Sequence, residues 1–243
     1  MNTIAVAAAS VTGARHRRVG RNGQDAVATW VDDGMAAVVV CDGCSAGAYS
    51  EVGARLGAAL WIAALARRMR SGESEAMWSA VRAEVVAQLA SIVEAMPGDR
   101  ALAIREHFMF TIVSAAVSRD GAAVWALGDG AYSLGGQTHV LGPFTDNQPP
   151  YLAYDLLGDP HEAHVAIGGP GLVVVATDGA LDLDTPLDDI VREAVAHPDA
   201  LRRRLEVLAR SGERIDWDAR AVHRTPAVLQ DDCAIAAISW RPA

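Results

Sequence analysis

The sequence contains no lysine, so all 21 of its basic residues are arginines. Aspartate and glutamate together number 30, which leaves a formal net charge of −9 at pH 7. This acidic balance argues against a nucleic acid or an anionic membrane surface as a partner. It also means that any phosphate group bound by a basic side chain must be bound by the bidentate guanidinium of an arginine.

The chain also lacks a hydrophobic run long enough for a membrane helix. Arg55 and the pair Arg67-Arg68 bracket the most hydrophobic helical segment, which keeps it short of the roughly 20 apolar residues that a span needs. Residues 1–10 hold a short apolar run with no basic residue before it, which favours a first strand over a signal peptide. We therefore expect a soluble, cytoplasmic protein that makes no membrane contact.

Cysteine is scarce, and the three cysteines are too few and too apolar in setting for a disulfide framework. Cys41 and Cys44 nevertheless form a C-x-x-C pair at the end of an apolar run, a pattern shared with redox sites. A zinc site would need Cys233 and a fourth ligand such as His16 or His107. Redox or zinc chemistry is therefore one alternative that the sequence leaves open.

The composition predicts a substantial core, because 51% of the 243 residues are hydrophobic. No stretch rich in proline, glycine or serine divides the chain, so we predict a single domain over residues 1–243. Hydrophobic periodicity predicts helices at 51–70, with Ser50 as the N-cap, and at 73–96, 187–197 and 198–211. The expected strands lie at 4–9, 26–31, 38–42, 108–117, 122–127, 131–134, 138–141, 164–167, 171–176 and 233–238.

Helices placed between two groups of strands favour an α+β fold with layered antiparallel sheets over a doubly wound fold. The strands at 164–167 and 171–176 are expected to form a hairpin. The basic segment 15–25 and the stretch 212–230 are expected to be irregular loops.

Three of the predicted strands end in Asp-Gly, at Asp42-Gly43, Asp129-Gly130 and Asp178-Gly179, and a fourth begins after Asp231-Asp232. Carboxylates gathered at the end of a core repel one another unless a cation neutralises them. Oxygen ligands of this kind suit Mg²⁺ or Mn²⁺ better than zinc or copper. The alternative is that each Asp-Gly pair is a hairpin turn, the commonest use of that dipeptide. The repetition behind buried strands favours the metal site.

Five short motifs follow one another along the chain: Asn22-Gly23-Gln24-Asp25, Asp42-Gly43, Gly128-Asp129-Gly130, Thr177-Asp178-Gly179 and Asp231-Asp232. In this order they resemble the metal-dependent protein serine/threonine phosphatases of the PPM, or type 2C, family, and most closely its compact bacterial branch. The resemblance covers about residues 10–240. It implies a four-layer αββα sandwich, in which two central antiparallel β-sheets are flanked by helix pairs and a cleft at one end holds a binuclear metal centre.

The resemblance also implies roles for single residues. Asp42 matches the carboxylate that bridges the two metal ions, and the Gly43 carbonyl matches a ligand of the second ion. Asp178 and Asp231 match the acids that hold the first ion. In the family motif the first residue of the final pair is the ligand, so Asp231 is favoured over Asp232.

Three further positions follow from the same resemblance. Asp25 matches an acid that reaches the second metal through water, and Asp129 matches the residue that holds a weaker third ion together with Asp178. Thr111 fits a threonine ahead of the Asp129 strand and is expected to be structural. The implied cofactors are two Mn²⁺ or Mg²⁺ ions, with a third as an option.

The implied reaction is direct hydrolysis of phosphoserine or phosphothreonine by a water shared between the ions, with Asp42 and Asp178 as the catalytic carboxylates. An arginine would bind the substrate phosphate. The family places this arginine at the position of Gly20, so Arg21 is the nearest candidate, with Arg17 and Arg18 as alternatives. The expected partners are phosphorylated proteins, namely a serine/threonine kinase and its substrates.

The chain departs from the family pattern at two other positions. Gly47 stands where many members have a histidine thought to protonate the leaving group, and Gln24 stands where many have a glutamate. These departures leave a second alternative open: a weak or inactive phosphatase-like module that binds phosphoproteins or a partner kinase. His16 lies in the basic segment beside the expected site, where it could reach a phosphate or pack the loop, and packing is the expected role.

Overall fold

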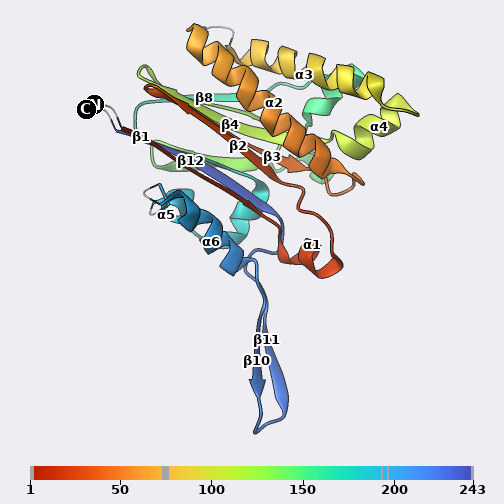
Figure 1. Ribbon diagram of the computed structural model, residues 1–243, viewed down its shortest axis with the longest axis vertical. Helices are drawn as coiled ribbons and strands as arrows, with labels where there is room; N and C mark the ends of the chain where they lie inside the picture. Colours follow the sequence, from red (N-terminus) through yellow and green to blue (C-terminus); the bar gives the residue numbers. More distant parts are fainter. Residues whose placement is uncertain (1–2, 73–76, 193, 196, 242–243) are drawn as a thin grey trace.

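Two five-stranded antiparallel sheets pack face to face at the centre of the molecule (Figure 1). The computed structural model describes residues 3–72, 77–192, 194–195 and 197–241. The first sheet contains, in spatial order, β1 (Thr3–Val11), β12 (Cys233–Arg241), β9 (Leu172–Ala176), β6 (Gly130–Leu134) and β7 (Gln137–Leu141). The second sheet contains β2 (Ala26–Asp32), β3 (Met35–Gly43), β4 (Phe110–Ser118), β5 (Gly121–Leu127) and β8 (His164–Gly168).

Strand β3 shows why the central strands are such continuous apolar runs. Val38 and Val40 lie in the core between the two sheets, whereas Val39 and Cys41 belong to the core under the helices. All four side chains are at most 1% exposed. A strand that is covered on both faces has no solvent side on which polar residues would alternate. The run ends at Asp42, where the strand reaches the edge of the core.

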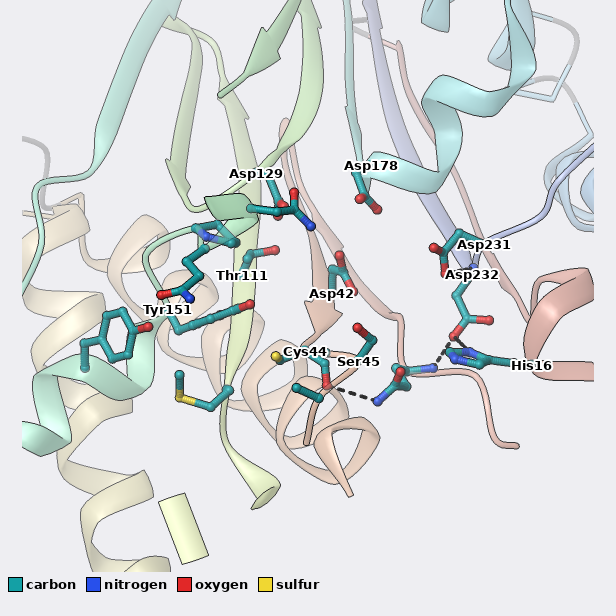
Figure 2. Close-up of a pocket in the computed structure, with 18 residues that line it drawn as sticks. His16, Asp42, Cys44, Ser45, Thr111, Asp129, Tyr151, Asp178, Asp231 and Asp232 are labelled. Carbon is teal, nitrogen blue, oxygen red and sulfur yellow. Dashed lines mark hydrogen bonds and ion pairs between the residues drawn. The ribbon is translucent and has the colours of Figure 1, made fainter. Parts of the chain in front are cut away.

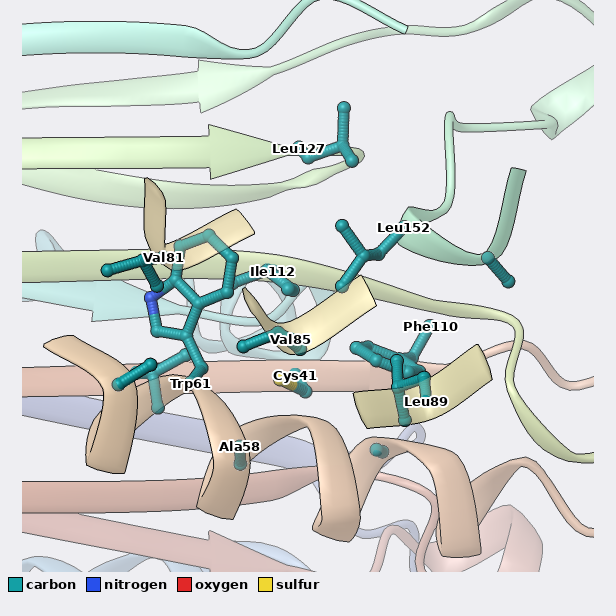
Figure 3. Close-up of a cluster of buried hydrophobic side chains, with 14 of the residues drawn as sticks. Cys41, Ala58, Trp61, Val81, Val85, Leu89, Phe110, Ile112, Leu127 and Leu152 are labelled. Atoms are coloured by element: carbon teal, nitrogen blue, oxygen red, sulfur yellow. The ribbon is translucent and has the colours of Figure 1, made fainter. Parts of the chain in front are cut away.

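Helices form the two outer layers. The helices α2 (Ser50–Ser71), α3 (Met77–Ala95) and α4 (Arg100–His107) cover the second sheet, whereas α5 (Leu187–Val191) and α6 (Pro198–Leu208) cover the first (Figure 1). Trp61 of α2 is fully buried among Val81, Val85 and Ile112 (Figure 3). Its ring lies 4.4 Å from that of Trp125 on β5. The predicted α+β fold, with two antiparallel sheets between helix layers, is confirmed.

The hairpin predicted for 164–176 is wrong. Strand β8 pairs with β5 in the second sheet, whereas β9 lies between β12 and β6 in the first sheet. The short connection between them crosses from one sheet to the other. An apolar pattern shows that a strand is buried, but it does not identify the strand that will pair with it.

Two segments predicted to be irregular contain regular structure, and α4 was not predicted at all. The basic segment contains the helix α1 (Ala14–Val19). The stretch 212–230 contains β10 (Gly212–Asp216) and β11 (Ala221–Thr225), which form a two-stranded ribbon projecting away from the sheets (Figure 1). Most residues of both strands are exposed, so no hydrophobic periodicity marked them as strands.

The predicted helix ends are less accurate than the helices themselves. Tyr49, rather than Ser50, occupies the N-cap position of α2, and Ser50 is the buried first residue of the helix. The start predicted for the next helix, at 73–76, and residues 193 and 196 of the predicted 187–197 helix lie outside the described residues. Within the described ranges, no helix is both long enough and apolar enough to cross a membrane.

Candidate active site

The predicted acids converge on one cleft, of about 380 Å³, between the ends of the two sheets (Figure 2). The second sheet contributes Asp42 and Gly43 from the end of β3 and Asp129 from the link between β5 and β6. The first sheet contributes Asp178, which follows β9 after Thr177, and Asp231, before β12. Five of the six predicted metal ligands therefore line a single cavity.

None of the three Asp-Gly pairs is the turn of a hairpin. The link Gly128-Asp129-Gly130 carries the chain from β5 in the second sheet to β6 in the first. Gly128 has a φ of +100°, and a Cβ there would lie 2.4 Å from the Thr111 side chain, so the crossing requires glycine. Asp42 ends β3, and Asp178 begins a 3-10 turn. The hairpin alternative is therefore wrong for all three pairs.

The carboxyl groups in the cleft raise one another's pKa. Desolvation raises the pKa of Asp42 well above its usual range, and the charges of Asp25, Asp178 and Asp129 raise it further. Burial, followed by the charges of Asp129 and Asp231, raises the pKa of Asp178 to about 6. Burial also raises the pKa of Asp129. Such a group of acids is stable only when protons or a cation neutralise it.

Asp25, the sixth predicted ligand, is only 6% exposed and lies behind the cleft rather than in its lining. Thr177 Oγ1 donates a hydrogen bond of 2.6 Å to Asp25 Oδ2. Asp25 also shares a hydrogen bond with the carboxyl group of Asp42, and burial raises the pKa of Asp25 to about 8. Two carboxyl groups can share a hydrogen bond only when one of them carries a proton. A cation would replace that proton.

The donor atoms of the cleft fit a hard divalent cation. Asp129 Oδ1 is buried and has no hydrogen-bond partner, so this oxygen is left for a ligand from outside the chain. The acids offer only oxygen, the donor that Mg²⁺ and Mn²⁺ prefer. Over the described residues, no group of three or more Asp, Glu, His or Cys side chains is arranged to hold a metal ion by itself. Mg²⁺ does not require such a group, because this ion keeps several waters and is usually bound by only one or two carboxylates.

Asp231 and Asp232 are adjacent in sequence but differ in their surroundings. Asp232 is 2% exposed and accepts hydrogen bonds from the backbone N–H groups of Gly13 and Gln24, at 2.7 and 2.6 Å. The Asp231 side chain is 50% exposed, and its nearest cation is Arg15, at 3.9 Å. Asp231 is therefore the member of the pair whose carboxylate is open to a ligand.

Arg21, predicted to bind the substrate phosphate, does not line the cleft. Its guanidinium donates to the carbonyl oxygens of Ser45, at 3.0 Å, and Gly47, at 2.7 Å. The alternative Arg17 binds Glu206 and the Thr12 carbonyl. Among the described residues that line the cleft there is no arginine. The structure thus gives Arg21 a role in holding the loop after β3, and it does not place it against a substrate.

The cysteines do not form the redox or zinc site left open by the sequence. All three are free. Cys41 is buried in the core under α2, whereas Cys233 is buried in the core on the other side of the molecule. Only Cys44 reaches the cleft wall. The C-x-x-C pair is therefore split between a core and a cavity, so its two thiols do not face one another.

Three residues of the cleft carry roles that the sequence did not reveal. Gln24 is 2% exposed, and its side-chain amide donates to the Cys44 carbonyl and to the Ser50 hydroxyl. Tyr151 lines the cleft and shares a hydrogen bond with Cys44, and burial raises its pKa. His16 lines the opposite end, against Asp232. Each depends on a contact between distant segments, which no local pattern encodes.

Comparison with known proteins gives one family match. Residues 12–214 match the family model described as Protein phosphatase 2C. No curated protein sequence matches the chain.

Solved structures of bacterial phosphatases share the fold. A bacterial serine phosphatase has a TM-score of 0.63 at 13% identity, with 99% of each chain covered. The serine/threonine phosphatase Stp1 from Staphylococcus aureus has a TM-score of 0.61 at 13% identity, covering 99% of this chain and 96% of Stp1. The catalytic domain of the serine threonine protein phosphatase PstP, in complex with 2 manganese ions, has a TM-score of 0.57 at 16% identity, and both chains are covered completely.

Proposed function

The chain belongs to the protein phosphatase 2C family of metal-dependent serine/threonine protein phosphatases, and we propose that it hydrolyses phosphoserine and phosphothreonine in proteins at a two-metal centre in the acidic cleft. The observation that carries this proposal is the convergence of Asp42, Asp129, Asp178 and Asp231 on one cavity. These residues come from segments far apart in the sequence and from both sheets. In this proposal residues 1–243 act as one catalytic domain.

Asp42 is the proposed bridging ligand, because acidic neighbours from both sheets raise its pKa. The other proposed ligands are the Gly43 carbonyl, Asp25, Asp178, Asp231 and, for a third ion, Asp129. When bound, two Mn²⁺ or Mg²⁺ ions would acidify a shared water and offset the charge on the phosphoryl oxygens.

The protein itself orients these oxygens. Thr111 hydrogen bonds to the Asp129 carboxylate, and the Thr177 hydroxyl donates to Asp25. Such contacts behind a ligand fix its direction and tune its affinity. Asp42 from the second sheet and Asp178 from the first, the two proposed catalytic carboxylates, both line the cleft and lie near one another (Figure 2). Hydrolysis by a metal-activated water would need no covalent enzyme intermediate.

The alternative is a weak or inactive module that binds phosphoproteins or a partner kinase. The position of Arg21 favours it, because this side chain is engaged with backbone carbonyls and leaves the cleft without a phosphate-binding arginine among the described residues. The acids of the cleft instead favour an active enzyme. Asp42 and Asp178 lie beside other carboxylates that repel them, and a bound cation would remove this repulsion.

The proposed partners are phosphorylated proteins, in particular a serine/threonine kinase and the substrates of that kinase. The acidic balance of the chain, with its net charge of −9, makes nucleic acid an unfavourable partner. A cytoplasmic location and the absence of membrane contact stay predictions.

The deciding experiment measures phosphate release from a phosphothreonine peptide by the purified protein, with Mn²⁺, with Mg²⁺ and with a chelator. We expect turnover with either ion and none with the chelator. Asp178→Asn should remove the turnover, whereas Asp120→Asn, an isosteric change at an exposed turn, should leave it unchanged. Calorimetric binding of Mn²⁺ without turnover in the unmutated protein would reject the enzyme and favour the binding module.

A further inference from the structure

Helix α1 places His16 at the cleft wall, with its ring directed toward the cavity and against Asp232 (Figure 2). His16 Nδ1 lies 2.8 Å from Asp232 Oδ2, and the His16 side chain is 14% exposed. The same Oδ2 accepts the Gln24 N–H, and Oδ1 accepts the Gly13 N–H. A carboxylate that accepts two backbone donors is the acceptor in its third contact as well, so Nδ1 is the donor.

This contact fixes the ring and leaves Nε2 as its available nitrogen. Over the described residues, Nε2 has no protein partner, and His16 is the one histidine that lines the cleft. The helix that carries the ring is itself tied down, because Arg17 pairs with Glu206 of α6 at 3.0 Å. The Ala14 N–H also binds the Leu229 carbonyl, at 3.2 Å, which ties α1 to the segment before Asp231. The imidazole is thus held at the acidic site by several independent contacts.

We propose that His16 is a catalytic residue that donates a proton from Nε2 to the leaving serine or threonine oxygen, with Asp232 as the positioning residue that holds the ring through Nδ1. This inference rests on the proposed function. A ring that donates to Asp232 through Nδ1 can give a proton from Nε2 only while both nitrogens carry one.

The chemistry balances without a further reactant. The bond between phosphorus and the side-chain oxygen breaks, and its electron pair stays on that oxygen, which takes the proton from Nε2. The attacking water forms the new phosphorus–oxygen bond and releases its proton to solvent, and the imidazole regains a proton from solvent. The products are the free hydroxyl side chain and inorganic phosphate.

The test compares two substrates that differ in their need for a proton. In His16→Asn the shorter amide can still donate to Asp232, but it has no atom at the position of Nε2. With Mn²⁺ bound, we expect kcat for a phosphothreonine peptide to fall by roughly 10²- to 10⁴-fold, the usual contribution of a general acid. For p-nitrophenyl phosphate we expect a far smaller fall, because p-nitrophenolate is a stable anion that leaves without protonation.

Three other outcomes would overturn the inference. An equal loss on both substrates would show that His16 supports structure or binds phosphate, and an unchanged kcat on the peptide would show that it has no role in the step. Both overturn the inference and leave the proposed function intact. If the unmutated protein hydrolyses neither substrate with Mn²⁺ or Mg²⁺, the proposed function fails and the inference fails with it. His223→Asn, on the exposed strand β11, is the matched control and should change neither rate.

Discussion

Two groups of carboxylates face the same cleft, and they differ in how their charge is satisfied. Asp232 accepts three hydrogen bonds from the chain, from two backbone N–H groups and one imidazole. Asp42 and Asp178 instead have mainly other carboxylates as neighbours, and their pKa values are raised. Asp232 is therefore an acid that stabilises the fold, whereas Asp42 and Asp178 need a cation from outside the chain. All three are aspartates, so their surroundings make the difference.

The largest expected effect is on catalysis. Asp42→Asn should lower phosphate release by roughly 10³-fold or more, the scale seen when a group essential to a reacting centre is removed. The metal-free variant should unfold at a temperature no lower than the unmutated protein, because the amide is neutral in a position where charge is unfavourable. Activity assays and thermal melts with chelator measure both. If Asp42→Asn instead unfolds at a much lower temperature without metal, Asp42 stabilises the fold in the way that Asp232 does.

A smaller but clear effect, on the stability of the metal-free protein, is expected when Asp232 is changed. Asp232→Asn cannot accept all three hydrogen bonds of the carboxylate, so at least one buried donor loses its partner. We expect the free energy of unfolding to fall by about 1–3 kcal/mol, the usual cost of an unsatisfied buried donor. Urea denaturation in the presence of chelator measures it. Unchanged stability would contradict the structural role of this acid.

The third effect is the pH dependence of the metal-free protein. The pKa of Asp25 is raised from 3.8 to about 8, so its contribution to stability is fully present below about pH 4 and is lost as the pH rises toward 8. With chelator present, raising the pH from 5 to 8 should therefore lower the melting temperature of the unmutated protein relative to that of Asp25→Asn. Added Mn²⁺ should restore the unmutated protein at pH 8. A pH-independent difference would mean that Asp25 is not held in a protonated state.

The smallest expected effect concerns Asp231, the neighbour of Asp232. Its side chain is half exposed, with only a long contact to Arg15. Asp231→Asn should therefore change the metal-free stability by no more than about 0.5 kcal/mol, as is usual for surface substitutions. Isothermal calorimetry should at the same time show weaker Mn²⁺ binding. A stability loss as large as that of Asp232→Asn would remove the distinction between the two residues.

The sequence predicted the strands that end at the cleft because burial on both faces leaves an uninterrupted apolar run, as in β3. It failed for β8 and β9, since two sheets of similar composition can each accept an apolar strand. It also failed for the ribbon of β10 and β11, whose side chains are mostly exposed and show no periodicity.

The candidate site was predictable in its acids but not in the groups around them. Asp42, Asp129 and Asp178 each follow a local pattern, an apolar strand that ends in Asp-Gly. The contacts of Arg21 with the loop after β3, and of His16 with Asp232, join residues 24 to 216 positions apart in the sequence. Only the folded chain brings those partners together.

The pairing of β1 with β12 has a consequence for the order of assembly during synthesis. Strand β12 lies between β1 and β9, and over the described residues it is the only strand to which β1 is hydrogen bonded. Strand β1 must therefore stay unpaired until β12 has been made, and contacts of such long sequence separation form slowly. Asp231 and Asp232 directly precede β12, so the cleft is complete only once β12 has paired with β1.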